Sequence, residues 1–155
     1  MQFLNYFFTS IISFSGLVIG VLLTKLAPEE QKPLEKSFVL SRKILLLMVF
    51  IFLALYYFNN GFYLAILILY FGFLLYIEYK IDDLLKKSII ISTALGILFF
   101  LSSKNTNLFA IESSLILLYG LPTASLLYDK KEKNQYKLLF YNSGAIIIAN
   151  LLFFV

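Results

Sequence analysis

Residues 44–79 read ILLLMVFIFLALYYFNNGFYLAILILYFGFLLYIEY, an apolar stretch with one turn signal near its middle. As a single straight helix it would be about 54 Å long at about 1.5 Å per residue, nearly twice the roughly 30 Å of hydrocarbon in a bilayer. It must therefore fold back on itself, and Asn59, Asn60 and Gly61 are residue types that favour such a turn. The stretch predicts two membrane-spanning helices joined by a tight turn.

Four further stretches have the length and composition of membrane spans, which need about 20 largely apolar residues. The weakest contains Lys86 and Lys87 near its start, and we expect their side chains to reach out to the lipid headgroups. The sequence therefore predicts an all-α integral membrane protein, a six-helix transmembrane bundle with short loops that forms a single domain over residues 1–155. The expected spans are residues 3–26, 39–58, 61–79, 84–103, 107–128 and 138–155.

Positive charge alternates with these apolar stretches. Twelve of the 13 Lys and Arg residues lie in three short segments, residues 25–43, 80–87 and 130–137, and Lys104 is the exception. Cytoplasmic loops of membrane proteins retain positive charge, so we expect the three segments inside and both termini outside. The excess of Lys over Arg, with abundant Ile, Phe, Tyr and Asn, is typical of a prokaryotic chain, so the expected location is a prokaryotic cytoplasmic membrane.

Composition excludes several function classes. The chain is 61% hydrophobic and 14% charged, whereas a soluble domain has about a quarter charged residues. It has no Cys and no His, which removes thiolate nucleophiles, the commonest general base and the usual zinc ligand. We expect no cofactor and no metal. Membrane orientation explains the net charge of +4 better than nucleic acid does.

Small and hydroxyl-bearing residues recur at helical spacing in the first, fourth and sixth spans. Helices in lipid associate through such residues, because apolar bulk gains nothing by leaving the lipid tails. Gly16 and Gly20 form a small-xxx-small contact motif, and Ser92 with Gly96 repeats the spacing. Spacings of three and four place each set on one helical face. These sets are Asn5, Thr9, Ser13, Gly16, Gly20 and Thr24 in the first span, and Asn142, Ala145 and Ala149 in the sixth.

The same residues predict which spans form the packed centre. We expect the first, fourth, fifth and sixth spans there. The second and third, residues 39–58 and 61–79, consist mostly of bulky side chains and are expected at the lipid-facing edge. Helix packing without any further function is the simpler interpretation of these motifs.

The fifth span contains the acid that we single out as a functional candidate. Glu112 lies inside residues 107–128, where an ionisable side chain is costly and marks a functional site by default. Glu112, Tyr119 and Thr123 are spaced to share one helical face. In the alternative interpretation, Glu112 lies in the headgroup layer, where an acid near a helix N-terminus is simply favourable.

The sequence predicts a helix kink and a set of polar partners to go with Glu112. Pro122 lacks a backbone N–H and its ring crowds the preceding turn, so together with Gly120 it predicts a helix kink. A buried Glu112 also needs polar partners at its own depth. Asn150, Thr9 and Lys104 at the adjoining turn are the expected members of such a cluster.

Acids also occur in the segments expected inside. Pro28 with Glu29 and Glu30 predicts one helical turn, which Pro33 is expected to end. Asp82 and Asp83 lie four residues before Lys86 and Lys87, a spacing that supports a helix through ion pairs. A magnesium site at this pair is the less favoured alternative.

Three function classes remain open. The first is a non-catalytic membrane component, as an accessory subunit of another membrane protein or as a homo-oligomer. The second is a small transporter with Glu112, Tyr119, Thr123, Asn150 and Thr9 as substrate or proton contacts on the kinked fifth helix. The third is an enzyme that acts on lipid headgroups through the four acids expected inside. Membrane lipids are the expected partners in each case.

Overall fold

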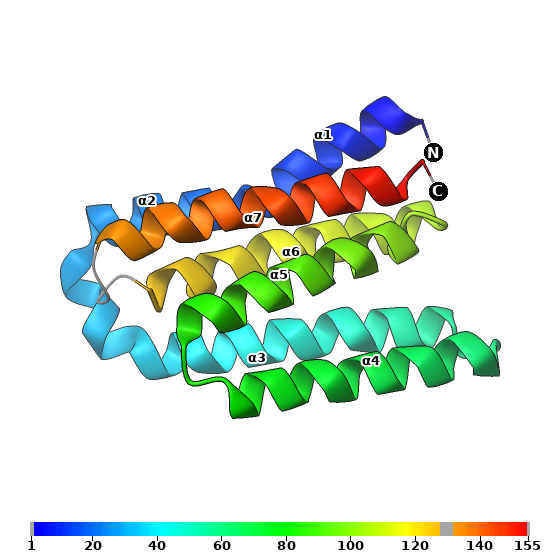
Figure 1. Ribbon diagram of the computed structural model, residues 1–155, viewed down its shortest axis with the longest axis horizontal. Coiled ribbons are helices and arrows are strands. Elements are labelled where there is room, and N and C mark those ends of the chain that lie inside the picture. Colours follow the sequence, from blue (N-terminus) through cyan, green and yellow to red (C-terminus); the bar gives the residue numbers. More distant parts are fainter. Residues whose placement is uncertain (1, 128–131, 155) are drawn as a thin grey trace.

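The computed structural model of the chain describes residues 2–127 and 132–154. Helices make up 88% of the described residues, which include no strand. The expected all-α class is therefore confirmed. The helices run back and forth along one long axis, and both termini lie at the same end (Figure 1). Their bounds are α1 Phe3–Phe14, α2 Gly16–Leu26, the 3-10 helix η1 Pro28–Glu30, α3 Gln31–Tyr56, α4 Gly61–Lys80, α5 Leu84–Ser102, α6 Thr106–Ser125 and α7 Glu132–Leu152.

Five helical segments of the described chain are long and apolar enough to cross a membrane: Phe3–Leu26, Pro28–Tyr56, Gly61–Lys80, Leu84–Ser102 and Thr106–Ser125. They correspond to the first five expected spans. The sixth, residues 138–155, falls on α7, whose apolar part Leu139–Leu152 is shorter than these five. A sixth crossing and the orientation of the chain stay predictions.

Asparagine and aspartate side chains cap the N-termini of three helices, α4, α5 and α6. Asn60 Oδ1 accepts from the Tyr63 N–H at 3.4 Å, and Asn105 Oδ1 accepts from the N–H groups of Asn107 and Leu108 at 3.0 and 3.1 Å. Asp83 Oδ1 accepts from the Leu85 N–H at 3.0 Å. Such caps satisfy backbone donors that have no partner within the helix. The two turns expected after residues 58 and 103 lie where these caps place them.

The start of α3 differs from the prediction. Pro33 was expected to end a single turn, but η1 ends at Glu30 and α3 begins at Gln31, with Pro33 in its first turn. Proline is tolerated there because the first N–H groups of a helix have no intrahelical acceptor. As a result, α3 starts eight residues before the expected span 39–58.

The first span is not one straight helix. Ser15 separates α1 from α2, and α1 leaves the direction of α2 in Figure 1. The Ser15 N–H donates to the carbonyl oxygens of both Ile11 and Ile12, at 3.0 and 3.1 Å. The Ser15 hydroxyl also donates to the Ile12 oxygen, at 2.7 Å. A side chain that bonds back onto the preceding turn competes with the regular ladder and bends the helix.

This break shifts the buried face of α1 by one residue. Asn5 is exposed and Thr9 only partly buried, while Tyr6 and Ser10 face the interior. The expected continuous stripe is therefore wrong at its N-terminal end. It holds from Ser13 onward, where the buried residues are Ser13, Gly16, Gly20 and Thr24.

Helix α6 lies at the centre of the bundle and packs against α1, α2, α3 and α5, while α7 packs mainly along α5. The prediction that residues 39–58 lie at the edge is wrong, because α3 runs along α6 and buries Leu46, Val49 and Leu53. The buried residues of α3 are bulky and include no small side chain. By contrast, α4 is peripheral as expected and buries only Leu67, Leu74 and Ile77.

Close backbone contact joins α2 to α6. A Cβ atom added to Gly16 would lie 1.9 Å from the carbonyl oxygen of Leu117, and one added to Gly120 would lie 2.5 Å from the Leu17 nitrogen. Only glycine fits at either position, so Gly120 serves this contact whatever its effect on helix shape. On the other side of the bundle, a Cβ on Gly96 would lie 2.8 Å from the Ala145 oxygen of α7. Ser92, buried one turn earlier, donates to the Ser88 oxygen at 2.7 Å.

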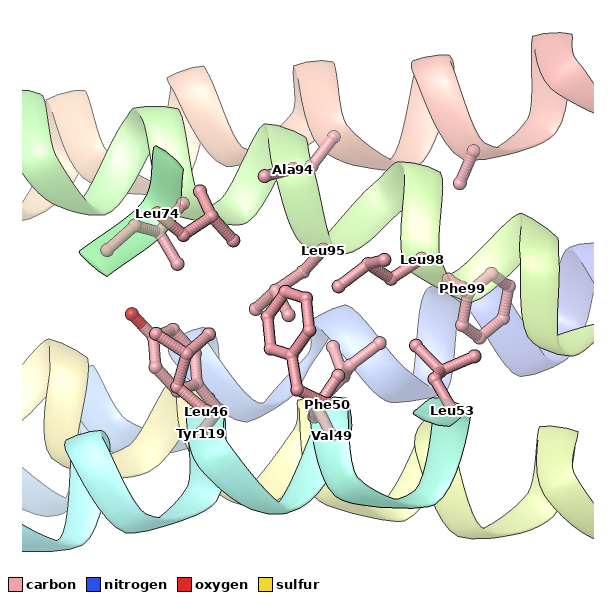
Figure 2. Close-up of a cluster of buried hydrophobic side chains, with 14 of the residues drawn as sticks. Leu46, Val49, Phe50, Leu53, Leu74, Ala94, Leu95, Leu98, Phe99 and Tyr119 are labelled. Atoms are coloured by element: carbon pink, nitrogen blue, oxygen red, sulfur yellow. The ribbon is translucent and has the colours of Figure 1, made fainter. Parts of the chain in front are cut away.

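The largest apolar cluster fills the space between α3 and α5, with Leu74 of α4 at one side (Figure 2). Tyr6 of α1 also belongs to this cluster. Its ring lies 5.1 Å from that of Phe99 and 5.6 Å from that of Phe109. Its hydroxyl donates to the Ala149 oxygen at 2.7 Å, which ties α1 to α7. The labelled members of the cluster are Leu46, Val49, Phe50, Leu53, Leu74, Ala94, Leu95, Leu98, Phe99 and Tyr119.

Candidate functional sites within the bundle

Glu112 is buried inside the bundle. It lies six residues after the first residue of α6, about 9 Å along the helix, and 0% of its surface is exposed. Neither of its carboxylate oxygens has a hydrogen-bond partner among the residues that the structure describes. A buried polar group without a partner is unfavourable, so this position calls for an explanation beyond packing.

The expected partners of Glu112 are placed elsewhere. Asn150 donates through Nδ2 to the Ser10 hydroxyl at 2.9 Å and to the Ile146 oxygen at 2.8 Å. Thr9 donates within its own helix, to the Asn5 oxygen at 2.7 Å. The shift of the buried face at Ser15 explains why Ser10 takes the place expected for Thr9.

Lys104 contacts a residue other than Glu112. Its Nζ is 5.5 Å from the centre of the Tyr63 ring, at the start of α4. No hydrogen bond joins Glu112 to Lys104, Thr9 or Asn150 in residues 2–127 and 132–154. The outer cluster expected around Glu112 is therefore not assembled in this structure.

Tyr119 and Thr123 continue the face of α6 that carries Glu112. Both are buried, and the Thr123 hydroxyl donates to the Tyr119 carbonyl oxygen at 2.8 Å. The Tyr119 hydroxyl has no partner in the described part of the chain. The expected kink does not appear as a break, because α6 continues through Pro122 and ends three residues later at Ser125. Pro122 has no N–H to donate to the Leu118 carbonyl oxygen, and this missing hydrogen bond falls in the last turn of the helix.

A second set of buried polar side chains lies toward the opposite end of the bundle. Arg42 on α3 is 2% exposed, and its Nη2 pairs with Oε1 of Glu78 on α4. Lys87 on α5 donates through Nζ to the Glu78 carbonyl oxygen at 2.6 Å and lies 3.8 Å from its Oε1. These contacts join three consecutive helices through one acid.

Sequence reasoning missed this set. Arg42 and Lys87 were interpreted as charges that set orientation, and Glu78 is a second acid within the expected span 61–79 that was not weighed against Glu112. The available signal was Glu78 itself, an acid inside the expected span 61–79 and nine residues before Lys87. The expected pairing of Asp83 with Lys87 is wrong, because Lys87 turns inward to Glu78 and Asp83 caps α5.

Tyr119 belongs with this second set. In Figure 2 its hydroxyl points away from Phe99, and the ring is near the side chain of Thr123 as well as the charges of Arg42 and Glu78. Arg42 Nη1, Glu78 Oε2 and the Tyr119 hydroxyl are all buried without a partner in the described residues. We call Arg42, Glu78, Lys87 and Tyr119 the inner polar cluster.

The remaining acids do not converge. Glu29, Glu30 and Asp82 are exposed, and the part of the chain that the structure describes has no group of three or more Asp, Glu, His or Cys residues that could hold a metal ion. Glu30 lines a cavity of about 410 Å³ with Leu34 and Phe38 of α3 and Pro122 of α6. The surface that lines this cavity is mostly apolar, and Glu30 is the one acid among the described residues that line it.

Comparison of the chain with protein-family models, curated proteins and solved structures finds no match. Function must therefore be inferred from the two buried polar sites and the apolar surface. Glu112 is a carboxyl group that can take up or release a proton inside the bundle. The inner polar cluster combines two cationic donors, one carboxylate and one hydroxyl, and three of these groups have a buried polar atom without a partner in the described residues.

Proposed function

We propose that this chain is a multi-pass integral membrane protein of a prokaryotic cytoplasmic membrane, with six spans and both termini outside. The apolar outer surface supports this proposal, and α4 exposes large apolar side chains most clearly. Leu69 is 76% exposed and Phe62 is 73% exposed. Large apolar side chains over a whole helix face are unfavourable in water and normal in lipid.

Within the membrane, the proposed role is that of a non-catalytic component, as an accessory subunit of another membrane protein or as a homo-oligomer. The observation that carries this role is the position of α4, which packs lightly on α3 and α5 and leaves most of its circumference uncovered. A helix placed in this way is suited to contact a further membrane helix. Its exposed side includes Gly72, at which an added Cβ would meet no atom within 4 Å.

Native mass spectrometry after gentle detergent extraction tests this role. The expected result is a stoichiometric complex with a second membrane protein or with further copies of this chain. Bulky substitutions of Gly72 should weaken the complex, whereas the same substitutions of Gly144, where an added Cβ also meets nothing within 4 Å, should leave it intact. Isolation only as a monomer with lipid would contradict the proposal.

A small proton-linked transporter is the second candidate, and the buried, unpartnered Glu112 favours it. In this proposal the acid binds a proton or a substrate group on α6, the helix that carries Pro122. Proteoliposomes that contain a trapped pH-sensitive dye provide the test. A proton flux that is present with the wild-type chain and lost in Glu112→Gln would support transport. Equal flux in both would remove this candidate.

A further inference from the structure

We propose that the inner polar cluster binds the phosphate group of an anionic ligand, from either a membrane lipid headgroup or a soluble phosphate. Four helices each supply one member: α3 supplies Arg42, α4 Glu78, α5 Lys87 and α6 Tyr119. The inference rests on the proposed membrane location only where it weighs a lipid source against a soluble one.

The charges of the cluster do not balance. Its three charged side chains are two cations and one carboxylate, and the exposed fraction of the side chain alone is 3% for Arg42, 8% for Glu78 and 11% for Lys87. Glu78 therefore offsets one positive charge and leaves one in a buried setting. A buried charge without a counterion is strongly unfavourable, so this arrangement favours the binding of an anion.

Unused donors show which kind of anion fits. Arg42 pairs with Glu78 through Nη2, and its Nη1 has no partner in the described chain. The Tyr119 hydroxyl has no partner there either. Lys87 uses one hydrogen on the Glu78 carbonyl oxygen, and an ammonium group has three. A guanidinium edge, an ammonium and a hydroxyl together suit the several oxygen atoms of a phosphate group.

The depth of the cluster matches the phosphate layer of a bilayer. Glu78 lies two residues before the end of α4, and Lys87 is the fourth residue of α5. Glu78 and Lys87 therefore lie within about one turn of their helix ends, next to the basic segment 80–87, whereas Tyr119 lies six residues before the end of α6. With that segment on the inner side, Glu78 and Lys87 lie at the level of inner-leaflet headgroups, which a soluble phosphate also reaches from the cytoplasm.

The test measures thermal stability of the full chain in a neutral detergent, titrated with inorganic phosphate, phosphatidylglycerol or diacylglycerol, the last having no phosphate. Lys87→Gln and Tyr119→Phe are the test variants, and Arg42 is left intact because it ties α3 to α4. Lys86→Gln is the matched control for charge, since Lys86 is adjacent and exposed. Tyr76→Phe is the control for the hydroxyl, since Tyr76 is on the outer surface.

We expect a phosphate-bearing ligand to raise the melting temperature of the wild type while diacylglycerol does not. Lys87→Gln and Tyr119→Phe should each weaken the apparent affinity about tenfold or more, since a tenfold change equals about 1.4 kcal/mol. Both controls should match the wild type. A response to phosphatidylglycerol alone assigns a lipid source, and a response to inorganic phosphate assigns a soluble one.

Three results would overturn the proposal. These are the absence of any phosphate response in the wild type, an equal loss of affinity in Lys86→Gln and Lys87→Gln, or an unchanged affinity in Tyr119→Phe with higher stability. The last result would mean that the hydroxyl is only an unpaired buried group. Membrane insertion and complex formation are measured separately, so the proposed function would survive a failure here.

Discussion

At the scale of single residues, the two buried polar sites differ in what holds them. Arg42 and Glu78 compensate each other across two helices, whereas both oxygens of Glu112 are without a partner in the described residues. The first arrangement stabilises contacts between helices once it is formed. The second opposes folding unless a proton or ligand neutralises it, so its retention is better explained by function than by stability.

Replacing Glu112 with methionine should therefore stabilise the protein. The side chains are similar in length, and the change removes a buried group that lacks a hydrogen bond. We expect the free energy of unfolding to rise by about 1–3 kcal/mol, seen as a higher melting temperature in detergent. Exposed Glu29→Gln is the control and should change it by about 0.5 kcal/mol or less. A loss of stability in Glu112→Met would mean that the carboxyl group has a structural partner.

A substitution at the glycine contact between α2 and α6 should instead lower the stability of the protein. In Gly16→Ala the new methyl group would lie 1.9 Å from the Leu117 oxygen, so the backbones must separate, at a cost of about 1–3 kcal/mol. Gly72→Ala is the matched control, because an added Cβ there meets nothing within 4 Å. It should be neutral or stabilising by up to about 1 kcal/mol. Equal melting temperatures for the two variants would contradict this close contact.

At the scale of helices, the local sequence predicts where a helix begins better than it predicts which face of the helix is buried. Asn60, Asp83 and Asn105 are strong caps, and α4, α5 and α6 begin next to them. The face of α1 was predicted one residue out of register, because helical periodicity alone does not reveal the break at Ser15. The packing of α3 along α6 was also missed, since bulky side chains look the same in the sequence whether lipid or another helix covers them.

The ion pairs around Glu78 should matter for the docking of α4. Glu78→Gln leaves Arg42 and Lys87 buried without their acid, and we expect a loss of about 3–5 kcal/mol in stability. The double variant Arg42→Met with Glu78→Met removes both members of the pair and should be less harmful than Glu78→Gln. Exposed Glu35→Gln on α3 is the control. Thermal unfolding checks all three, and a double variant worse than Glu78→Gln would refute this account.

At the scale of the whole molecule, hydropathy and charge predicted a helical membrane-protein architecture, because lipid allows few ways to satisfy the backbone. Glu112 was singled out because it lies five residues inside the expected span 107–128, where an ionisable side chain is costly. Glu78 and Arg42 were missed because near a span end they resemble ordinary interfacial charges. Their pairing depends on how α3, α4 and α5 meet, and no local pattern encodes that.

The orientation can be tested directly, because the chain has no cysteine. Asn59→Cys, in the turn between α3 and α4, should react with a membrane-impermeant maleimide on intact cells. Lys36→Cys should react only after permeabilisation, since it lies in a basic segment expected inside. Both positions are exposed, so burial does not explain a difference between them. The reverse pattern would invert the topology, and labelling of both on intact cells would contradict membrane insertion.

The central position of α6 has a consequence for biosynthesis. The extensive contacts of α2 and α3 are with α6, and the main contacts of α5 are with α7, whereas the contacts among α2, α3, α4 and α5 are few. The earlier helices therefore leave the ribosome before the helix that holds them together has been made. A nascent chain stopped at residue 104 should be degraded faster in a pulse-chase experiment than one stopped at residue 127. For the membrane protein that we propose, we expect the first stable assembly to coincide with translation of the last third of the chain, and the earlier helices to depend on the insertion machinery until then.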